Sequence, residues 1–542
     1  MKASLLLVLL LGFALRAAHL DFGLDTADIR GAQLQHQQDE EGMVRRVREG
    51  FMNGDPNPGV FMMWGALGYH LFGVADTAVV GVQALDHPDG WGGRLAELAE
   101  NPSLLHFVHR CVSLFAGLIT ILLVWVLARR ELGERVALVA ALILSTAYLP
   151  VRESHFGTLD ALTTLWVIAA VDRALLIARA PTKRNHVMAG LFIGLAAATK
   201  YFGAIAALPV IAGHLASRDA SDKSDARARP SFLWLVLAGL AAVLTWLAVT
   251  ANAVYAPGEF METLGHQSDR AAIRWDLDEW ARVAGLHLRW SLVVGLGVTA
   301  FAAALIGCVL GWRARGPARG IVICCVLLLP MLFFVRAAPV RYALSLVTLL
   351  CIPAAFACER LATRGGTVRR GLLALLVLLA IAPGAIRSVA FDRALGNRDT
   401  RQDVLDHLAT AGATPQDVLA IGFYGLPRPS MVFGQPPFMD YLRMTWPRGG
   451  VISREEGQRM RPRFILHDHT AHEQDPIGWD DFAEVVAREY RQVLHVDPRT
   501  DPDAVALPDQ DAGTPSFLMA YAEPWKMTRP GPPLTLYERV EP

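Results

Sequence analysis

Long apolar runs alternate with short polar connections along the first 390 residues. Several runs reach, with their flanks, the roughly 20 residues that a helix needs to cross a bilayer. The pattern predicts about eleven membrane spans, near residues 3–20, 106–128, 134–151, 157–178, 187–199, 202–217, 231–253, 291–311, 320–335, 341–358 and 370–389. We therefore expect an α-helical polytopic membrane protein.

Composition agrees with this interpretation. Of the 542 residues, 53% are hydrophobic and only 19% are charged, which is unusual for a soluble protein of this size. The 51 Lys and Arg equal the 51 Asp and Glu, so the charge indicates no basic surface and we expect no nucleic-acid partner. The six cysteines lie in or at the ends of apolar stretches, and we interpret them as facing lipid or core. The sequence assigns no metal site or cofactor, and a need for a divalent cation stays open.

Every second connecting loop is basic. Arg and Lys are concentrated at 129–135, 179–184, 218–229, 313–319 and 360–370. Because basic loops stay cytoplasmic, this alternation predicts that the N-terminus lies inside and that the tail after about residue 390 lies outside. The other outer segments are then 21–105, 152–156, 200–201, 254–290 and 336–340. We interpret the first span as uncleaved, because Arg16 interrupts the small residues of a cleavage site.

The tail has ordinary soluble patterning. It predicts a helix over 400–411 and strands over 417–423, 463–467, 491–496 and 534–540, which together make a small α/β domain. His467, His469 and His472 have a spacing that permits metal binding, but we interpret them as a scattered surface set.

Two outer segments carry further polar patterns. Asp39, Glu40 and Glu41 stand together just before a predicted helix, where an acid can serve as a general base or simply favour the N-terminal helix dipole. The segment 254–290, rich in Trp and acids, predicts a pair of amphipathic surface helices that cover a site or lie passively at the membrane interface.

Ionisable residues also stand at the edges of predicted spans, where burial in lipid is costly. These are Arg152, His155, Asp160, Lys200 and Arg341, all at outer ends in the predicted topology. Cations from separate spans that converge on one face would bind a phosphate. Taken singly, each is also typical of an interface anchor.

The order of these features resembles the GT-C superfamily of polyprenyl-phosphate-sugar-dependent glycosyltransferases, in the branch of protein O-mannosyltransferases and lipid A aminoarabinose transferases. The resemblance covers about two-thirds of the chain and follows an ordered set of motifs: Arg16, Asp39-Glu40, Gly54-Asp55 with Asn57-Pro58, Arg152 with His155 and Asp160, Thr199-Lys200-Tyr201, and Arg341-Tyr342. Many relatives have Pro where this chain has Gln38, and Pro58-Gly59 replaces a double proline.

The resemblance implies a role for each motif. Asp39 is expected to deprotonate the acceptor with support from Glu40, and Asp160 to position the acceptor or the loop. The donor phosphate is expected to be held by Arg152, Lys200, Arg341 and Tyr342, while His155 positions the acceptor. Relatives invert the anomeric centre in one in-line displacement, so the base and the phosphate clamp lie on opposite sides of the sugar.

The same resemblance implies partners and a location. The expected donor is a polyprenyl-phosphate-linked sugar, the acceptor is an unidentified protein, lipid or glycan hydroxyl, and membrane lipids surround the chain. We expect a bacterial inner-membrane protein with a cytoplasmic N-terminus, a transmembrane catalytic domain over 1–390 with outer loops 21–105 and 254–290, and a periplasmic domain over 391–542.

Two other functions compete with this one. A transporter or flippase of lipid-linked saccharides would also need many spans and buried charges, but it predicts mid-bilayer charges and internal repeats that the sequence does not display. A non-catalytic membrane scaffold predicts that Asp39→Asn leaves the phenotype intact.

Overall fold

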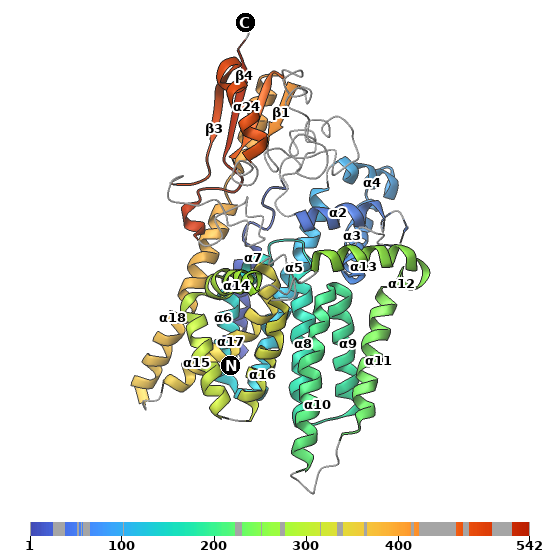
Figure 1. The fold of residues 1–542 in the computed structure, drawn as a ribbon, viewed down its shortest axis with the longest axis vertical. Coiled ribbons are helices and arrows are strands. Elements are labelled where there is room, and N and C mark those ends of the chain that lie inside the picture. Colours follow the sequence, from blue (N-terminus) through green and yellow to red (C-terminus); the bar gives the residue numbers. More distant parts are fainter. Residues whose placement is uncertain are drawn as a thin grey trace.

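A helical bundle with a small sheet at one end makes up the chain (Figure 1). The computed structural model describes residues 2–24, 38–50, 52, 54, 55, 57, 65–100, 102–222, 230–250, 252–271, 277–314, 316–332, 340–362, 366–413, 417–421, 462–469, 476–500 and 523–540.

The bundle contains a helix at each of the eleven predicted spans. These are α1 (Lys2–Ala17), α5 (Ser103–Leu132), α6 (Glu134–Thr146), α8 (Asp160–Arg179), α9 (Lys183–Thr199), α10 (Ala207–Asp222), α11 (Phe232–Val249), α15 (Val298–Ala314), α16 (Pro317–Leu328), α17 (Leu344–Leu361) and α18 (Gly366–Leu395). Within the described part of the chain, five helical segments are long and apolar enough by themselves to cross a membrane. The number is six if the helices Trp280–Val294 and Val298–Ala314, which are bent by 106° relative to each other, form one span. The number of spans therefore stays a prediction.

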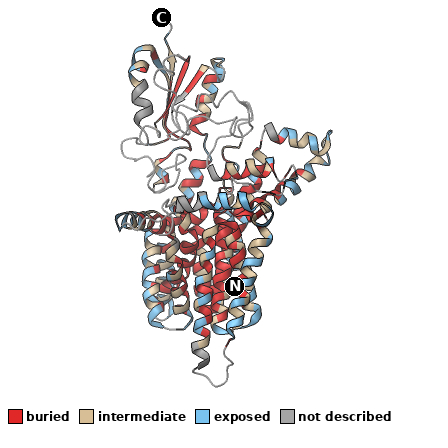
Figure 2. Cartoon of the chain, turned by 45° about the vertical axis from the view of Figure 1, so that its right-hand side comes forward, coloured by how far each residue is buried: buried red, intermediate tan, exposed pale blue. Residues whose placement is uncertain are grey.

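Burial within the bundle separates central from peripheral helices. α17 is the central helix, since 94% of its most apolar window is buried, whereas only 6% of that of α11 is. Figure 2 shows the buried residues inside the bundle and the exposed ones around it. Glycines allow close helix contact: a Cβ on Gly307 of α15 would lie 1.8 Å from the Pro353 oxygen of α17. The exposed apolar residues of the outer helices suit a lipid surrounding.

Shorter helices cover the end of the bundle nearest the sheet. From the first predicted outer segment come α2 (Gln38–Glu49), α3 (Ala66–Ala84) and α4 (Gly90–Glu100), and from the 254–290 segment come α12 (Asn252–Tyr255), α13 (Pro257–Ala271) and α14 (Leu277–Leu286). Figure 1 shows α13 lying across the ends of α8, α9 and α11, while α10 ends at the opposite end of the bundle. The predicted pair of surface helices in the 254–290 segment is confirmed, but α3, a helix of 19 residues, was missed.

Breaks in several of the predicted spans were also missed. α6 ends at Thr146, and a separate helix α7 (Tyr148–Glu153) begins after Ala147, which is extended at φ −63° and ψ 130°. The span predicted at 202–217 starts with the 3-10 turn η2 (Tyr201–Ala206), and the one at 320–335 becomes the 3-10 turn η4 (Leu329–Leu332).

The C-terminal residues form a four-stranded sheet in the order β1-β2-β4-β3. The strands β1 (Val418–Ile421), β2 (Phe464–Asp468), β3 (Tyr490–Val496) and β4 (Leu534–Arg539) confirm the four predicted ones, as α19 (Thr400–Thr410) confirms the helix. β1 and β2 are parallel and the other pairs antiparallel, and a further helix, α24 (Pro476–Glu489), was missed. The interpretation of the histidines as a scattered surface set is wrong for His467, because all five residues of β2 are buried and His467 is one of them. His472 lies outside the described residues.

Candidate active site

Three charged residues from separate helices meet at the sheet end of the bundle. Asp160 begins α8, Lys200 follows the last residue of α9, and Arg341 lies in the 3-10 turn η5 (Val340–Ala343) before α17. Lys200 Nζ lies 2.7 Å from Asp160 Oδ1, and Arg341 Nε lies 3.5 Å from Asp160 Oδ2. All three are buried, at 2, 4 and 8% exposure, so each charge depends on the others for compensation.

Aromatic rings line the Lys200 side of this cluster. Lys200 Nζ lies 5.5 Å from the centre of the Tyr342 ring and 5.9 Å from that of Phe202, and the two rings are 4.9 Å apart. Cations within about 6 Å of an aromatic face are stabilised by it. The rings therefore hold the ammonium group in place, and Phe202 is a contributor that the sequence did not single out.

Arg152 joins the cluster through its neighbour. It forms an ion pair with Glu153 and lies 5.0 Å from the centre of the Phe156 ring. Glu153 in turn interacts electrostatically with Asp160 and Arg341. Among the described residues, three cations and two carboxylates thus gather at this point, and guanidinium and ammonium groups are the side chains that bind phosphate.

Glu40 links α2 to the loop that precedes Asp160. Its Oε1 accepts hydrogen bonds from His106 Nδ1 at 2.9 Å and Arg110 Nε at 2.8 Å, and its Oε2 accepts one from the Gly157 amide at 3.2 Å. Burial alone would raise the pKa of Glu40, but the Arg110 charge and the His106 hydrogen bond lower it to about 2. Glu40 is therefore a buried carboxylate that stays ionised.

Gly157 is where α2, α5 and this loop touch. A Cβ at Gly157 would lie 2.6 Å from the His109 Cβ and 3.2 Å from the Glu40 Cγ. Next to it, His109 and Asp76 of α3 form a fully buried hydrogen bond of 2.8 Å, with Phe72 stacked on the imidazole. Only glycine fits at this point without displacing a neighbour.

The first outer segment also contacts the Lys200 turn. The Gly65 amide donates to the Thr199 carbonyl at 3.0 Å, and a Cβ at Gly65 would lie 1.9 Å from the Ala198 oxygen. Segments that are more than 130 residues apart therefore close on the same cluster.

Asp39 lies next to Glu40 in α2, but its side chain lies outside the described residues. His155 lies elsewhere: its ring nitrogens contact the carbonyls of Val151 and Ala18 at 3.0 and 3.1 Å, and its Nε2 is 3.3 Å from Asp392 of α18. The structure thus brings together Asp160, Lys200, Arg341 and Tyr342, and ties Glu40 to the same loop. It places the His155 ring against α1 and α18.

Four polar residues of this region were missed by the sequence analysis. They are Asp76, His106, His109 and Arg110, of which the last three form an H-x-x-H-R pattern at the start of α5. Buried ionisable residues at the edge of an apolar run were the available signal. In the described part of the chain, no group of three or more His, Cys, Asp or Glu residues is arranged to hold a metal ion.

Residues 103–248 match the family of dolichyl-phosphate-mannose-protein mannosyltransferases. A stretch of 112 residues is 38% identical to an undecaprenyl phosphate-alpha-4-amino-4-deoxy-L-arabinose arabinosyl transferase of Edwardsiella ictaluri, and a similar stretch matches that of Pectobacterium carotovorum equally. Each of these stretches spans one fifth of this chain and one fifth of the relative.

Solved structures share the whole fold. ArnT from Cupriavidus metallidurans bound to undecaprenyl phosphate has a TM-score of 0.54 and 16% identity, over 87% of this chain and 94% of that one. The oligosaccharyltransferase AglB from Archaeoglobus fulgidus, in complex with an inhibitory peptide and a dolichol-phosphate, has a TM-score of 0.52 and 12% identity, over 100% and 88%. These findings confirm the resemblance to the GT-C superfamily and its aminoarabinose transferase-like branch.

Proposed function

We propose that this chain, with its GT-C fold, is an integral membrane glycosyltransferase that moves a sugar from a polyprenyl phosphate to a hydroxyl-bearing acceptor. The observation that carries the proposal is the meeting of Lys200 and Arg341 at Asp160, from three helices at one end of the bundle. Arginine and lysine side chains that meet at one buried point are typical of a phosphate site. Transfer takes place on the side of the sheet, which the basic loops make the periplasmic side of a bacterial inner membrane.

The buried cations bind the phosphate of the donor, which is the leaving group. Lys200, Arg341 and Arg152, with Tyr342 beside them, bind the donor phosphate and stabilise the charge that it gains as the bond to the sugar breaks. Asp160 keeps Lys200 and Arg341 in place between turnovers, since a buried cation without a counter-charge is unfavourable. Phosphate binding then replaces part of the Asp160 interaction.

Asp39 activates the acceptor. Asp39 takes the proton of the acceptor hydroxyl, the oxygen attacks the anomeric carbon, and the polyprenyl phosphate leaves with the electron pair of the broken bond. An in-line displacement requires base and phosphate on opposite sides of the sugar, which inverts the anomeric centre. Support comes from the separate origins of the two groups: Asp39 is on α2, whereas Arg152 is on α7, Lys200 directly follows α9 and Arg341 is in η5.

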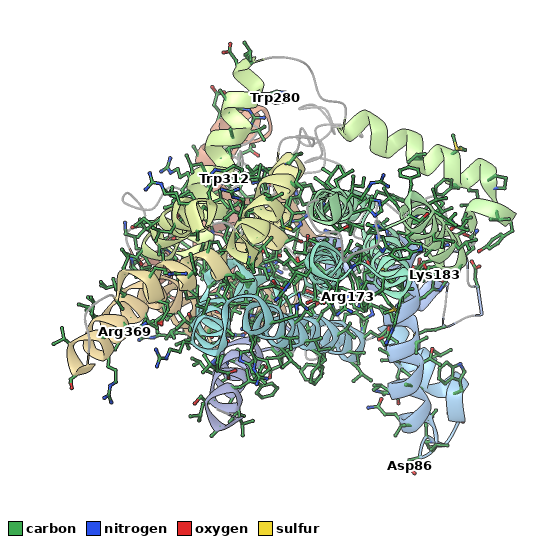
Figure 3. All side chains as sticks on the ribbon, turned by 90° about the horizontal axis from the view of Figure 1, so that it is seen from below. Asp86, Arg173, Lys183, Trp280, Trp312 and Arg369 are labelled. Carbon is green, nitrogen blue, oxygen red and sulfur yellow. The ribbon has the colours of Figure 1, made fainter. Side chains whose placement is uncertain are left out.

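A transfer assay with matched controls tests the proposal. Purified protein is mixed with membrane extract and radiolabelled polyprenyl-phosphate sugars, including the mannose and aminoarabinose donors that the matched families suggest. Asp39→Asn and Lys200→Ala should each lower transfer at least about a hundredfold. Asp86→Asn and Lys183→Ala are the controls and should retain activity, because Asp86 is exposed at the tip of the arm formed by α3 and α4 and Lys183 is exposed at the other end of α9 (Figure 3).

Two results would overturn the proposal. Equal transfer by the wild type and all four variants removes the site assignment. If instead none of the donors is consumed but a labelled lipid-linked saccharide changes leaflet in proteoliposomes, the chain is a transporter of such lipids.

A further inference from the structure

A groove of about 600 Å³ lies away from the charged cluster, between the sheet end of α18 and the turn η9 (Pro524–Lys526). Its α18 wall contains Ile386, Val389 and Arg393, and its opposite wall contains Trp525 and Met527. This volume falls in the usual range for a small-molecule site.

The apolar wall continues along α18 into the bundle. Leu375, Leu379, Ile386 and Val389 are 51, 49, 59 and 55% exposed, and their spacing of three, four or seven residues puts them on one face of the helix together with Arg393. α18 belongs to a segment long and apolar enough to cross a membrane, and only 17% of its most apolar window is buried. Because Ile386 and Val389 of the groove lie on the same face of α18 as Leu375 and Leu379, the groove opens towards the hydrocarbon of the bilayer.

The polar end of the groove is cationic. Arg393 is exposed, and within the described part of the chain no carboxylate pairs with it. The Arg387 guanidinium lies 5.4 Å from the centre of the Trp525 ring, and Trp525 itself is 45% exposed. Exposed Trp and Arg at the end of a membrane helix are typical of the headgroup level, where Arg binds phosphate.

We propose that this groove binds an anionic phospholipid from the leaflet on the side of the sheet. One acyl chain lies along Ile386 and Val389, and the phosphate meets Arg393 near Trp525. A lipid fits better than a protein partner because the apolar wall lies on the same helix face as the membrane-facing residues Leu375 and Leu379. The proposal is independent of the transferase function, since none of these residues belongs to the Asp160 cluster.

Native mass spectrometry of the full-length protein in detergent tests the headgroup contact. With phosphatidylglycerol and phosphatidylcholine of identical chains, the wild type should bind phosphatidylglycerol at least about tenfold more tightly. Arg393→Gln should remove that preference, because a charge-assisted phosphate contact is worth about this factor. Arg289→Gln is the control and should keep it, since Arg289 is also exposed and stacked on a Trp, 4.3 Å from the centre of the Trp290 ring, but lies outside the groove.

A second pair of measurements tests the chain contact. Ile386→Ser with Val389→Ser keeps both arginines and should weaken phosphatidylglycerol binding about as much as Arg393→Gln does. Soluble glycerol phosphate should fail to displace the bound lipid at equal concentration. Equal binding of the two lipids by the wild type, an unchanged Arg393→Gln, or displacement by glycerol phosphate would each overturn the proposal. An unchanged thermal midpoint shows that the variants are folded.

Discussion

Replacement of Glu40 by Gln tests whether its carboxylate holds α2 to the loop before Asp160. The amide keeps the shape of the side chain but has no charge, and in either orientation its NH₂ group faces a donor, on His106 and Arg110 or on the Gly157 amide. The folded protein lowers the pKa of Glu40 from its ordinary 4.5 to about 2, although burial opposes this. At about 1.4 kcal/mol for each pKa unit, the folded state favours the charged form by about 3 kcal/mol. We expect Glu40→Gln to lose a free energy of unfolding of about this size.

Denaturant titration in mixed micelles measures this loss, and Glu97→Gln is the matched control. Glu97 also pairs with an Arg and a His, Arg94 and His87, but its side chain is 53% exposed. Exposed ion pairs contribute little, so the control should change stability much less than Glu40→Gln does. Similar losses in the two variants would refute the reasoning, because the burial of the Glu40 pair would then have no consequence.

The pH dependence of the same loss gives a second check. Because the folded pKa is lowered, the stabilisation by Glu40 is fully present above the unfolded value near 4.5 and disappears as the pH falls towards about 2. The difference between wild type and Glu40→Gln should therefore stay constant from pH 6 to 8. A difference that falls within this window would show that another group carries the effect.

Three further outcomes follow from the geometry. Gly157→Ala should cost about 1 to 3 kcal/mol of stability in the same titration, because its Cβ has no room; a neutral result would contradict the contact. Asp160→Asn combined with Lys200→Met should unfold at a higher temperature than Asp160→Asn alone, because the double variant leaves one buried cation fewer uncompensated; a lower midpoint would contradict the ion pair. In intact cells, a membrane-impermeant maleimide should label Asp86→Cys but not Lys183→Cys, and the reverse would invert the topology.

Hydropathy predicted the bundle because each span contains its own apolar run. The breaks were not visible in this way, because they depend on contacts between distant segments. Ala147 has the residue type with the highest helix propensity, so its sequence predicts no break. The break lies where α18 crosses, since a Cβ on Gly384 would lie 2.8 Å from the Thr146 oxygen. α3 was missed for a related reason, since its buried Asp76 is compensated by His109 on α5, and a sequence window shows the acid without its partner.

In the candidate site, too, the sequence identified single residues but not the contacts between them. Asp160, Lys200 and Arg341 could be singled out because a charge at the edge of an apolar run is rare and needs a partner. Which residues pair could not be predicted, since Lys200 and Asp160 are 40 positions apart and Arg341 is further still. Arg110 is the clearest omission. Its partner, Glu40, is 70 residues earlier in the chain.

The surroundings of Glu40 bear on which acid is the base. A general base needs a free lone pair aimed at the acceptor and a pKa close to the working pH. Glu40 accepts three hydrogen bonds, is buried and has a pKa of about 2, so it is a poor acceptor of a hydroxyl proton. The saturation of Glu40 therefore favours Asp39 as the proposed base, with Glu40 as the residue that positions α2.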